Sequence, residues 1–159
     1  MARTYGRLAH AACRGDEVPS RVVEAMRTRP FLVGGTERFD SILMEQTEGR
    51  VLAKVGAEGV HSLALLDAKI GAALKVEDGA QRAQYPAVLR LLQYLGALPD
   101  PLPQPLAEFL RRPVRNTRGE VVGDALRREE VAGLRHPEQA AQCTRSSRPP
   151  PSSSSGWRR

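Results

Sequence analysis

The fold is decided by the stretch Arg50-Val-Leu-Ala-Lys-Val-Gly-Ala-Glu-Gly-Val-His-Ser-Leu-Ala-Leu-Leu66. Its two apolar runs, residues 50–55 and 60–66, are rich in β-forming residues, and Gly56 and Gly59 between them are typical of a tight turn. Residues 67–71 predict a second turn and residues 72–76 a third strand. Three short strands joined by brief turns predict an antiparallel sheet.

Upstream of this stretch the apolar residues recur at helical spacing instead. The first thirty residues predict two helices separated at Gly15 and Asp16, with Pro19 near the start of the second and Pro30 closing it. The glycine-rich run 31–36 predicts a turn or loop, and residues 38–47 predict a short helix.

Downstream, residues 79–98 predict a longer helix, in which Pro86 either introduces a kink or marks the first turn. The proline-rich segment 99–105 predicts an extended connection. Residues 106–110 predict one or two helical turns, and residues 114–123 a last strand folded around Arg118 and Gly119.

The fold class expected from these elements is α+β, with an antiparallel sheet flanked by helices. A length of 159 residues suits one modest domain. We expect that domain to span residues 1–126. Residues 127–159 form a basic tail rich in Ser, Pro and Arg, whose composition predicts disorder.

The net charge of +6 is concentrated in the tail, because residues 125–159 contribute seven arginines against three glutamates. The rest of the chain carries only +2. With one aromatic residue in the tail and no recognition motif, specific nucleic-acid binding is not expected. Neither a membrane span nor a secretory signal is evident, so we expect a cytoplasmic protein. Neither cysteine has neighbours at metal-ligand spacing.

Four segments resemble those of a known family. Phe31-Leu-Val-Gly-Gly-Thr-Glu-Arg-Phe-Asp-Ser-Ile-Leu-Met44 and Gly49-Arg-Val-Leu-Ala-Lys-Val-Gly-Ala-Glu-Gly59 are similar to the central signature of the rhizobial-type (type II) L-asparaginases. Gly71-Ala-Ala-Leu-Lys-Val-Glu-Asp-Gly-Ala80 and Pro113-Val-Arg-Asn-Thr-Arg-Gly-Glu-Val-Val-Gly123 follow in the same order. Four ordered segments are far more specific than any one of them.

The resemblance implies hydrolysis of asparagine to aspartate and ammonia, in a fold similar to serine β-lactamases. It implies an active site of two Ser-Lys pairs, one in a Ser-x-x-Lys motif, and a zinc site in a Cys-Ser-Gly-Lys-His segment. Neither motif occurs in this sequence. We therefore expect this chain to be the C-terminal half of such an enzyme, with half of a β-lactamase-like fold. We expect it to have no cofactor site of its own and no activity alone.

Lys54 is the one active-site element that carries over, because it matches the lysine of the family's Lys-Gly-Gly-Ala-Glu-Gly segment. Its surroundings, Val51-Leu52-Ala53 and Val55, are apolar. A desolvated lysine can act as a base toward a serine hydroxyl. The alternative is a lysine on the solvent face of an alternating strand. The sequence departs from the family at Val55, which is usually glycine, and at Glu37, which is often glycine.

Other candidate site residues flank Lys54. Glu58 either presents a carboxylate toward an amide or ammonium group or is a solvated turn residue. Gly35 and Thr36, with Gly34, either supply donors to a developing oxyanion or serve only their turn. Arg38 either binds a substrate carboxylate or is solvated. A hairpin would allow Ser62 to lie near Lys54, while His61 alternates to the opposite face.

Three hypotheses of function remain open. In the first, the chain is one part of an asparaginase whose missing half, as a separate chain or an upstream reading frame, supplies the serine. In the second it is a truncated, non-catalytic remnant, and in the third it is an interaction protein that uses its basic tail. An exposed core surface would also permit a homodimer.

Overall fold

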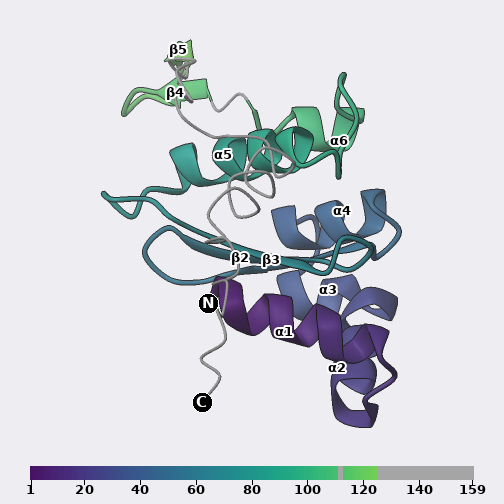
Figure 1. Cartoon of the computed structure of the whole chain (residues 1–159). Helices are drawn as coiled ribbons and strands as arrows, with labels where there is room; N and C mark the ends of the chain where they lie inside the picture. Colours follow the sequence, from purple (N-terminus) through teal and green to yellow (C-terminus); the bar gives the residue numbers. More distant parts are fainter. Residues whose placement is uncertain (111–112, 125–159) are drawn as a thin grey trace, which may run out of the picture. The chain divides into compact units, whose positions relative to one another are not determined.

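A three-stranded antiparallel sheet forms the centre of the chain (Figure 1). The structure is a computed structural model that describes residues 1–110 and 113–124. The strands are β1 (Val51–Val55), β2 (Val60–Leu65) and β3 (Ile70–Lys75), in the order β1-β2-β3. The predicted antiparallel sheet is confirmed. β3 begins earlier than predicted, because Ile70 and Gly71 already pair with Leu65 and Ala64.

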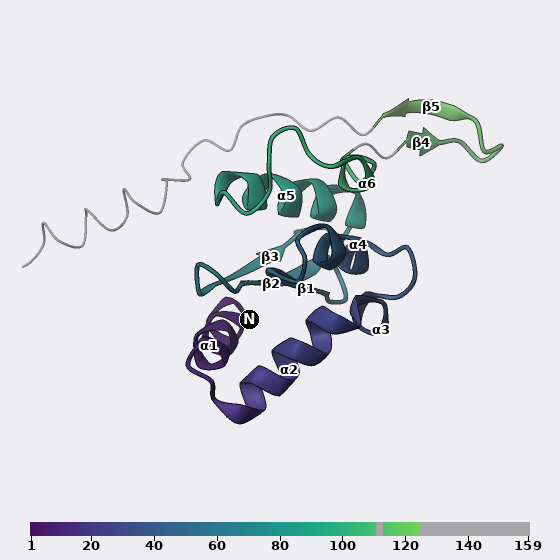
Figure 2. The same cartoon turned by 90° about the vertical axis from the view of Figure 1, so that its right-hand side faces the viewer.

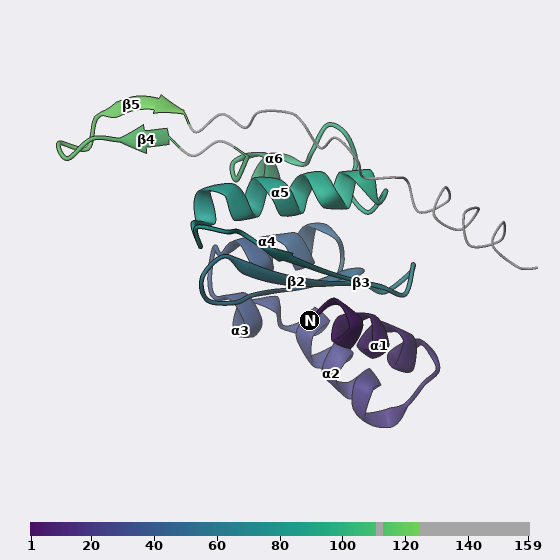
Figure 3. The ribbon, with the colours of Figure 1, turned by 60° about the vertical axis from the view of Figure 1, so that its left-hand side comes forward.

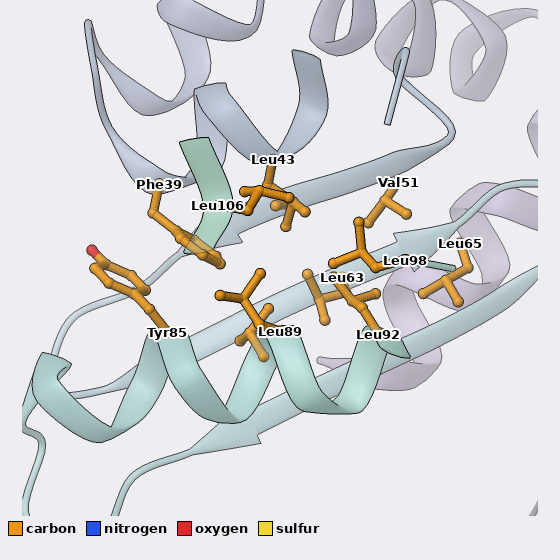
Figure 4. Close-up of a cluster of buried hydrophobic side chains, with 12 residues drawn as sticks. Phe39, Leu43, Val51, Leu63, Leu65, Tyr85, Leu89, Leu92, Leu98 and Leu106 are labelled. Carbon is orange, nitrogen blue, oxygen red and sulfur yellow. The ribbon is translucent and has the colours of Figure 1, made fainter. Parts of the chain in front are cut away.

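The larger hydrophobic cluster lies on one face of this sheet, beneath α5 (Gln81–Tyr94) and α6 (Gln104–Ala107) (Figure 2). It also receives side chains from α4 (Phe39–Gln46). Strand alternation explains its composition, since every second residue of β1 and β2 points to this face. Its buried members are Phe39, Leu43, Val51, Ala53, Leu63, Leu65, Tyr85, Val88, Leu89, Leu92, Leu98 and Leu106 (Figure 4).

The opposite face of the sheet is covered by α1 (Ala2–Cys13) and α2 (Glu17–Thr28) (Figure 3). Here a second cluster contains Ala9, Val23, Met44, Leu52 and Ala64. The two predicted N-terminal helices and the break between them are confirmed. Because helices cover both faces, residues 51–53 of β1 and 61–65 of β2 alternate between two buried environments, whereas Lys54 and alternate residues of β3 are exposed.

Two expectations about short segments were wrong. Helix α2 ends just before Pro30, as predicted, but Pro30 then opens a short helix, α3 (Pro30–Gly34), in the run expected to be a turn or loop. Proline suits the first turn of a helix because its missing N–H would have no partner there. For the same reason Pro105 lies in the first turn of α6, inside the segment expected to be extended.

The other helix predictions are confirmed with small shifts. Helix α4 covers the core of the predicted 38–47 helix, and α5 ends four residues before the predicted 98. Pro86 lies in the interior of α5 and is buried, so it does not mark the first turn. β4 (Pro113–Arg115) and β5 (Val121–Asp124) form the predicted strand pair around Gly119.

The fold is α+β, as predicted from the sequence. No helix within residues 1–110 and 113–124 is long and apolar enough to cross a membrane. The expected tail from residue 127 lies outside the described residues.

Candidate functional site

Lys54 is the next-to-last residue of β1, where the strand enters its turn. Its side chain is exposed, and Nζ donates to the carbonyl oxygen of Val55 at 2.8 Å. By alternation Lys54 points to the same face as Leu52, which is the face covered by α1 and α2. The apolar run therefore buries the neighbours of Lys54 but does not desolvate its ammonium group.

Ser62 lies directly opposite Lys54 in the β1–β2 pairing. The hairpin thus places the two residues side by side, as considered from the sequence. The Ser62 hydroxyl is buried and has no hydrogen-bond partner among the described residues. With only 1% of the residue exposed, a substrate in solvent does not reach this hydroxyl.

Glu58 occupies the turn between β1 and β2 in a left-handed conformation, with φ of 54°. The turn is held from β3, because Lys75 Nζ donates to the carbonyl oxygen of Glu58 at 2.6 Å. Glu58 itself is exposed, and in the part of the chain that the structure describes its carboxylate makes no ion pair with Lys54. The structure therefore brings Lys54 and Glu58 to the same end of the sheet without joining their side chains.

Gly35, Thr36 and Arg38 lie between α3 and α4. Gly35 has φ of 96°, a conformation that favours glycine, and a β-carbon added there would lie 3.1 Å from Cγ of Arg38. The stem of Arg38 therefore packs over the glycine. Thr36 and Arg38 are exposed, which leaves the hydroxyl and the guanidinium accessible.

Glu37 adopts a left-handed conformation with φ of 55°. A glycine would reach this conformation without strain, which gives a physical reason for glycine at this point of the family pattern. Val55, the other departure, is an ordinary strand residue paired with His61. Its side chain is accommodated in the sheet.

A buried polar group that the sequence analysis did not identify lies beside this strand. Asp40 and His61 are 2% and 0% exposed, and Asp40 Oδ1 lies 3.1 Å from His61 Nε2. The contact is short but is not aligned as a hydrogen bond, and neither atom has another partner among the described residues. Asp40 Oδ2 accepts the backbone N–H of Val55 at 2.7 Å.

Gln84 of α5 completes the group. Its Nε2 donates to the carbonyl oxygen of Val60 at 2.7 Å and lies 3.3 Å from Nδ1 of His61. Because an amide nitrogen only donates, Nδ1 accepts and the ring proton resides on Nε2, facing Asp40. A weak signal was present in the sequence, since Asp40 and His61 each begin a pair of polar residues that has apolar residues on both sides.

Asp40 also acts on Tyr5 of α1. Burial raises the pKa of the Tyr5 phenol above its usual 10.0, and the negative charge of Asp40 raises it further. Charge of like sign disfavours the phenolate. The buried carboxylate of Asp40 therefore contacts His61 on one side of the sheet and raises the pKa of Tyr5 on the other.

The predicted site residues do not line an open pocket of about 650 Å³ in the described part of the chain. That pocket is lined by Glu24, Arg27, Thr28, Arg29, Pro30, Phe31, Met44, Glu45, Glu48 and Gly49. No group of three or more His, Cys, Asp or Glu side chains within the described residues could hold a metal ion. The Cys-Ser-Gly-Lys-His segment that the resemblance associates with zinc does not occur in the sequence.

The family model described as L-asparaginase II matches residues 1–126. No curated protein matches the chain.

Proposed function

Because the chain belongs to the L-asparaginase II family, we propose that it serves the hydrolysis of asparagine to aspartate and ammonia and supplies one part of that active site. The observation that carries the proposal is the position of Lys54. It is exposed at the end of β1, beside the turn that contains Glu58. An amine in this position is open to a substrate and to a nucleophile brought from elsewhere.

Each candidate residue has a proposed task. When the segment that brings the serine covers Lys54 and desolvates its amine, Lys54 in its neutral form takes the proton from the serine hydroxyl, which makes the oxygen a nucleophile toward the amide carbon. The Thr36 backbone N–H and the Thr36 hydroxyl donate to the oxyanion that forms. Gly35, whose own N–H donates to the carbonyl oxygen of Phe31, shapes the turn that presents Thr36. Arg38 binds the α-carboxylate of the substrate, and Glu58 receives its ammonium group.

The serine is not supplied by the described residues. Ser20 and Ser41 donate to backbone carbonyl oxygens, and Ser62 is inaccessible. We propose that it comes from the Ser-x-x-Lys segment of the family, which does not occur in these 159 residues. A separate chain or another segment provides it, and the 159 residues alone release no ammonia.

An ammonia-release assay with asparagine tests both parts of this proposal. The purified chain is assayed alone and mixed with a separately produced polypeptide that carries the Ser-x-x-Lys and Cys-Ser-Gly-Lys-His segments of a family member. We expect release only in the mixture and its loss in Lys54→Ala. Lys69→Ala is the matched control, since Lys69 is an exposed lysine in the β2–β3 turn.

Two results would count against the proposal. Ammonia release by the chain alone, abolished in Lys54→Ala, would show that the nucleophile is present in these residues. If the two polypeptides formed a complex that released no ammonia, the proposed catalytic role of Lys54 would be contradicted.

A further inference from the structure

Two polar residues in the first turn of α4, Asp40 and Ser41, are each only 2% exposed. Burial of a carboxylate is costly unless hydrogen bonds compensate it. An acid in the first turn of a helix commonly caps that helix. Here no side chain caps α4. Both residues instead bond to segments outside the helix.

Asp40 bonds to the strand that contains Lys54. Amides of an antiparallel strand point alternately to its two edges. Gly56 N donates to Val60 across the β1–β2 pair, so the N–H of Val55 points to the other edge. Asp40 Oδ2 accepts that N–H at 2.7 Å. The carboxylate thus takes the place of a neighbouring strand at the residue that follows Lys54.

The second oxygen of Asp40 faces His61, whose ring is in turn held by Gln84. His61 also packs edge-on against Phe39, with ring centroids 5.5 Å apart. These contacts restrict the carboxylate from three elements, α4, β2 and α5. A side chain fixed on all sides holds its partner amide in one place.

Ser41 bonds to the glycine-containing segment. Its hydroxyl donates to the carbonyl oxygen of Gly35 at 2.6 Å, with the oxygen of Pro30 at 3.2 Å. Gly34 packs directly against this serine, because a β-carbon there would lie 2.6 Å from Oγ. Two adjacent residues of α4 therefore hold the two segments that contain the candidate site. Asp40 holds the end of β1, and Ser41 holds the Gly35 segment.

We propose that Asp40 and Ser41 are positioning residues, which set the Lys54 end of β1 and the Gly35 segment in fixed places relative to one another. The inference rests on the proposed function, because it explains these contacts by the need to keep the Lys54 and Gly35 parts of the proposed active site together. Neither side chain reaches substrate. Asp40 acts through the Val55 backbone, and Ser41 through the Gly35 backbone.

Nuclear magnetic resonance of the full chain tests this without any catalytic readout. The sequence has only three lysines, Lys54, Lys69 and Lys75, so their side-chain signals in an isotope-labelled sample are readily assigned. In Asp40→Ala we expect the Val55 amide and Lys54 side-chain signals to shift while the Lys69 signal stays. Asp40→Asn retains an acceptor for Val55 and should leave Lys54 close to its original position.

Val55→Pro tests the same bond from the other partner. Proline removes the N–H that Asp40 accepts, at an outward-facing position where a strand tolerates proline. We expect the Lys54 signal to shift as in Asp40→Ala, and the double variant to shift it no further. In Ser41→Ala the Gly35 and Thr36 amide signals should shift instead.

Asp78→Ala is the matched control, because Asp78 also accepts a backbone N–H, that of Ala80, but is exposed. It should leave the Lys54 signal in place. A Lys54 signal that is unmoved in folded Asp40→Ala or Val55→Pro overturns the proposal, as does an equal shift in Asp40→Asn. If Asp40→Ala does not fold, the contrast between Val55→Pro and Asp40→Asn decides.

Failure of the proposed function would look different. In that case the Lys54 signal would respond to Asp40 as expected, while the two-chain mixture described above would release no ammonia. The geometry and its catalytic purpose are thus tested by separate measurements.

Discussion

Gly6 of α1 and Gly71 of β3 lie backbone against backbone. A β-carbon added to Gly71 would be 2.1 Å from the amide nitrogen of Gly6, a separation that atoms cannot adopt. The helix therefore rests on the strand without intervening side chains, and α1 lies close enough to the sheet for Ala9 and Tyr5 to join the cluster there.

Gly71→Ala is expected to lower the free energy of unfolding by about 3 kcal/mol, because overpacking forces the backbones apart. Urea denaturation followed by circular dichroism measures the change. Gly123→Ala is the control, since nothing lies within 4 Å of the added carbon. Equal effects of the two substitutions would contradict the close approach.

The ionisation of Tyr5 should report the charge of Asp40. The pKa of Tyr5 is raised above 10.0 in the folded chain by burial and then by Asp40. The phenolate absorbance of Tyr5 is the part of the signal that disappears in Tyr5→Phe, and we expect it to titrate above pH 10. In Asp40→Asn the Tyr5 signal should titrate at lower pH, because the charge of Asp40 is removed while the burial of Tyr5 remains. An unchanged titration would mean that Asp40 carries no charge in the fold.

The raised pKa of Tyr5 also has a consequence for stability. Below pH 10 both folded and unfolded chains keep the phenol protonated, so Tyr5 adds no pH dependence. Above it the unfolded chain ionises first and binds fewer protons, so stability falls as pH rises toward the folded pKa. The difference in unfolding free energy between the original chain and Tyr5→Phe, measured across this range, should show that decline.

Lys75 should rigidify the turn that contains Glu58. Its Nζ donates to the carbonyl oxygens of Glu58 and Val76 at 2.6 and 2.7 Å. In Lys75→Met we expect the Val76 amide, which donates to Gly59, to exchange with solvent several-fold faster, since local opening becomes easier. Hydrogen exchange measures this. Lys69→Met should leave the rate unchanged, and a similar acceleration there would argue against a specific bond.

Glu37→Gly is expected to stabilise the chain by up to about 1 kcal/mol, because a left-handed conformation costs a non-glycine residue about that much or more. The gain is partly offset by the greater freedom of glycine in the unfolded chain. Thermal unfolding measures the difference. Glu77→Gly, at an exposed position without positive φ, should stabilise nothing, and a gain there would point to a general effect of removing a glutamate.

Local patterns predicted most of the fold. The β-rich runs separated by Gly56 and Gly59 predicted the hairpin, because strand pairing around a tight turn leaves little freedom. The structure then paired Ser62 with Lys54, which the sequence had left as a possibility. The short helix α3 was missed because its five residues end in glycine, which usually indicates a turn. Helical spacing has no meaning over so short a segment.

The site was predicted less completely, for a physical reason. Lys54 was identified through the family resemblance, while spacing alone left its face of the strand open. The group of Asp40, His61 and Gln84 joins residues 21 and 23 positions apart in the chain. No periodicity within one element predicts such a contact, which depends on how α4 and α5 pack against β2.

Helix α4 contributes to both hydrophobic clusters through adjacent residues, Leu43 to one and Met44 to the other. Detachment of this helix would therefore expose apolar surface on both sides of the sheet at once. Detachment of α4 would therefore disrupt both hydrophobic clusters together rather than one before the other. Because Asp40 of the same helix accepts the Val55 N–H, detachment of α4 would also release the strand end with Lys54 in the same event.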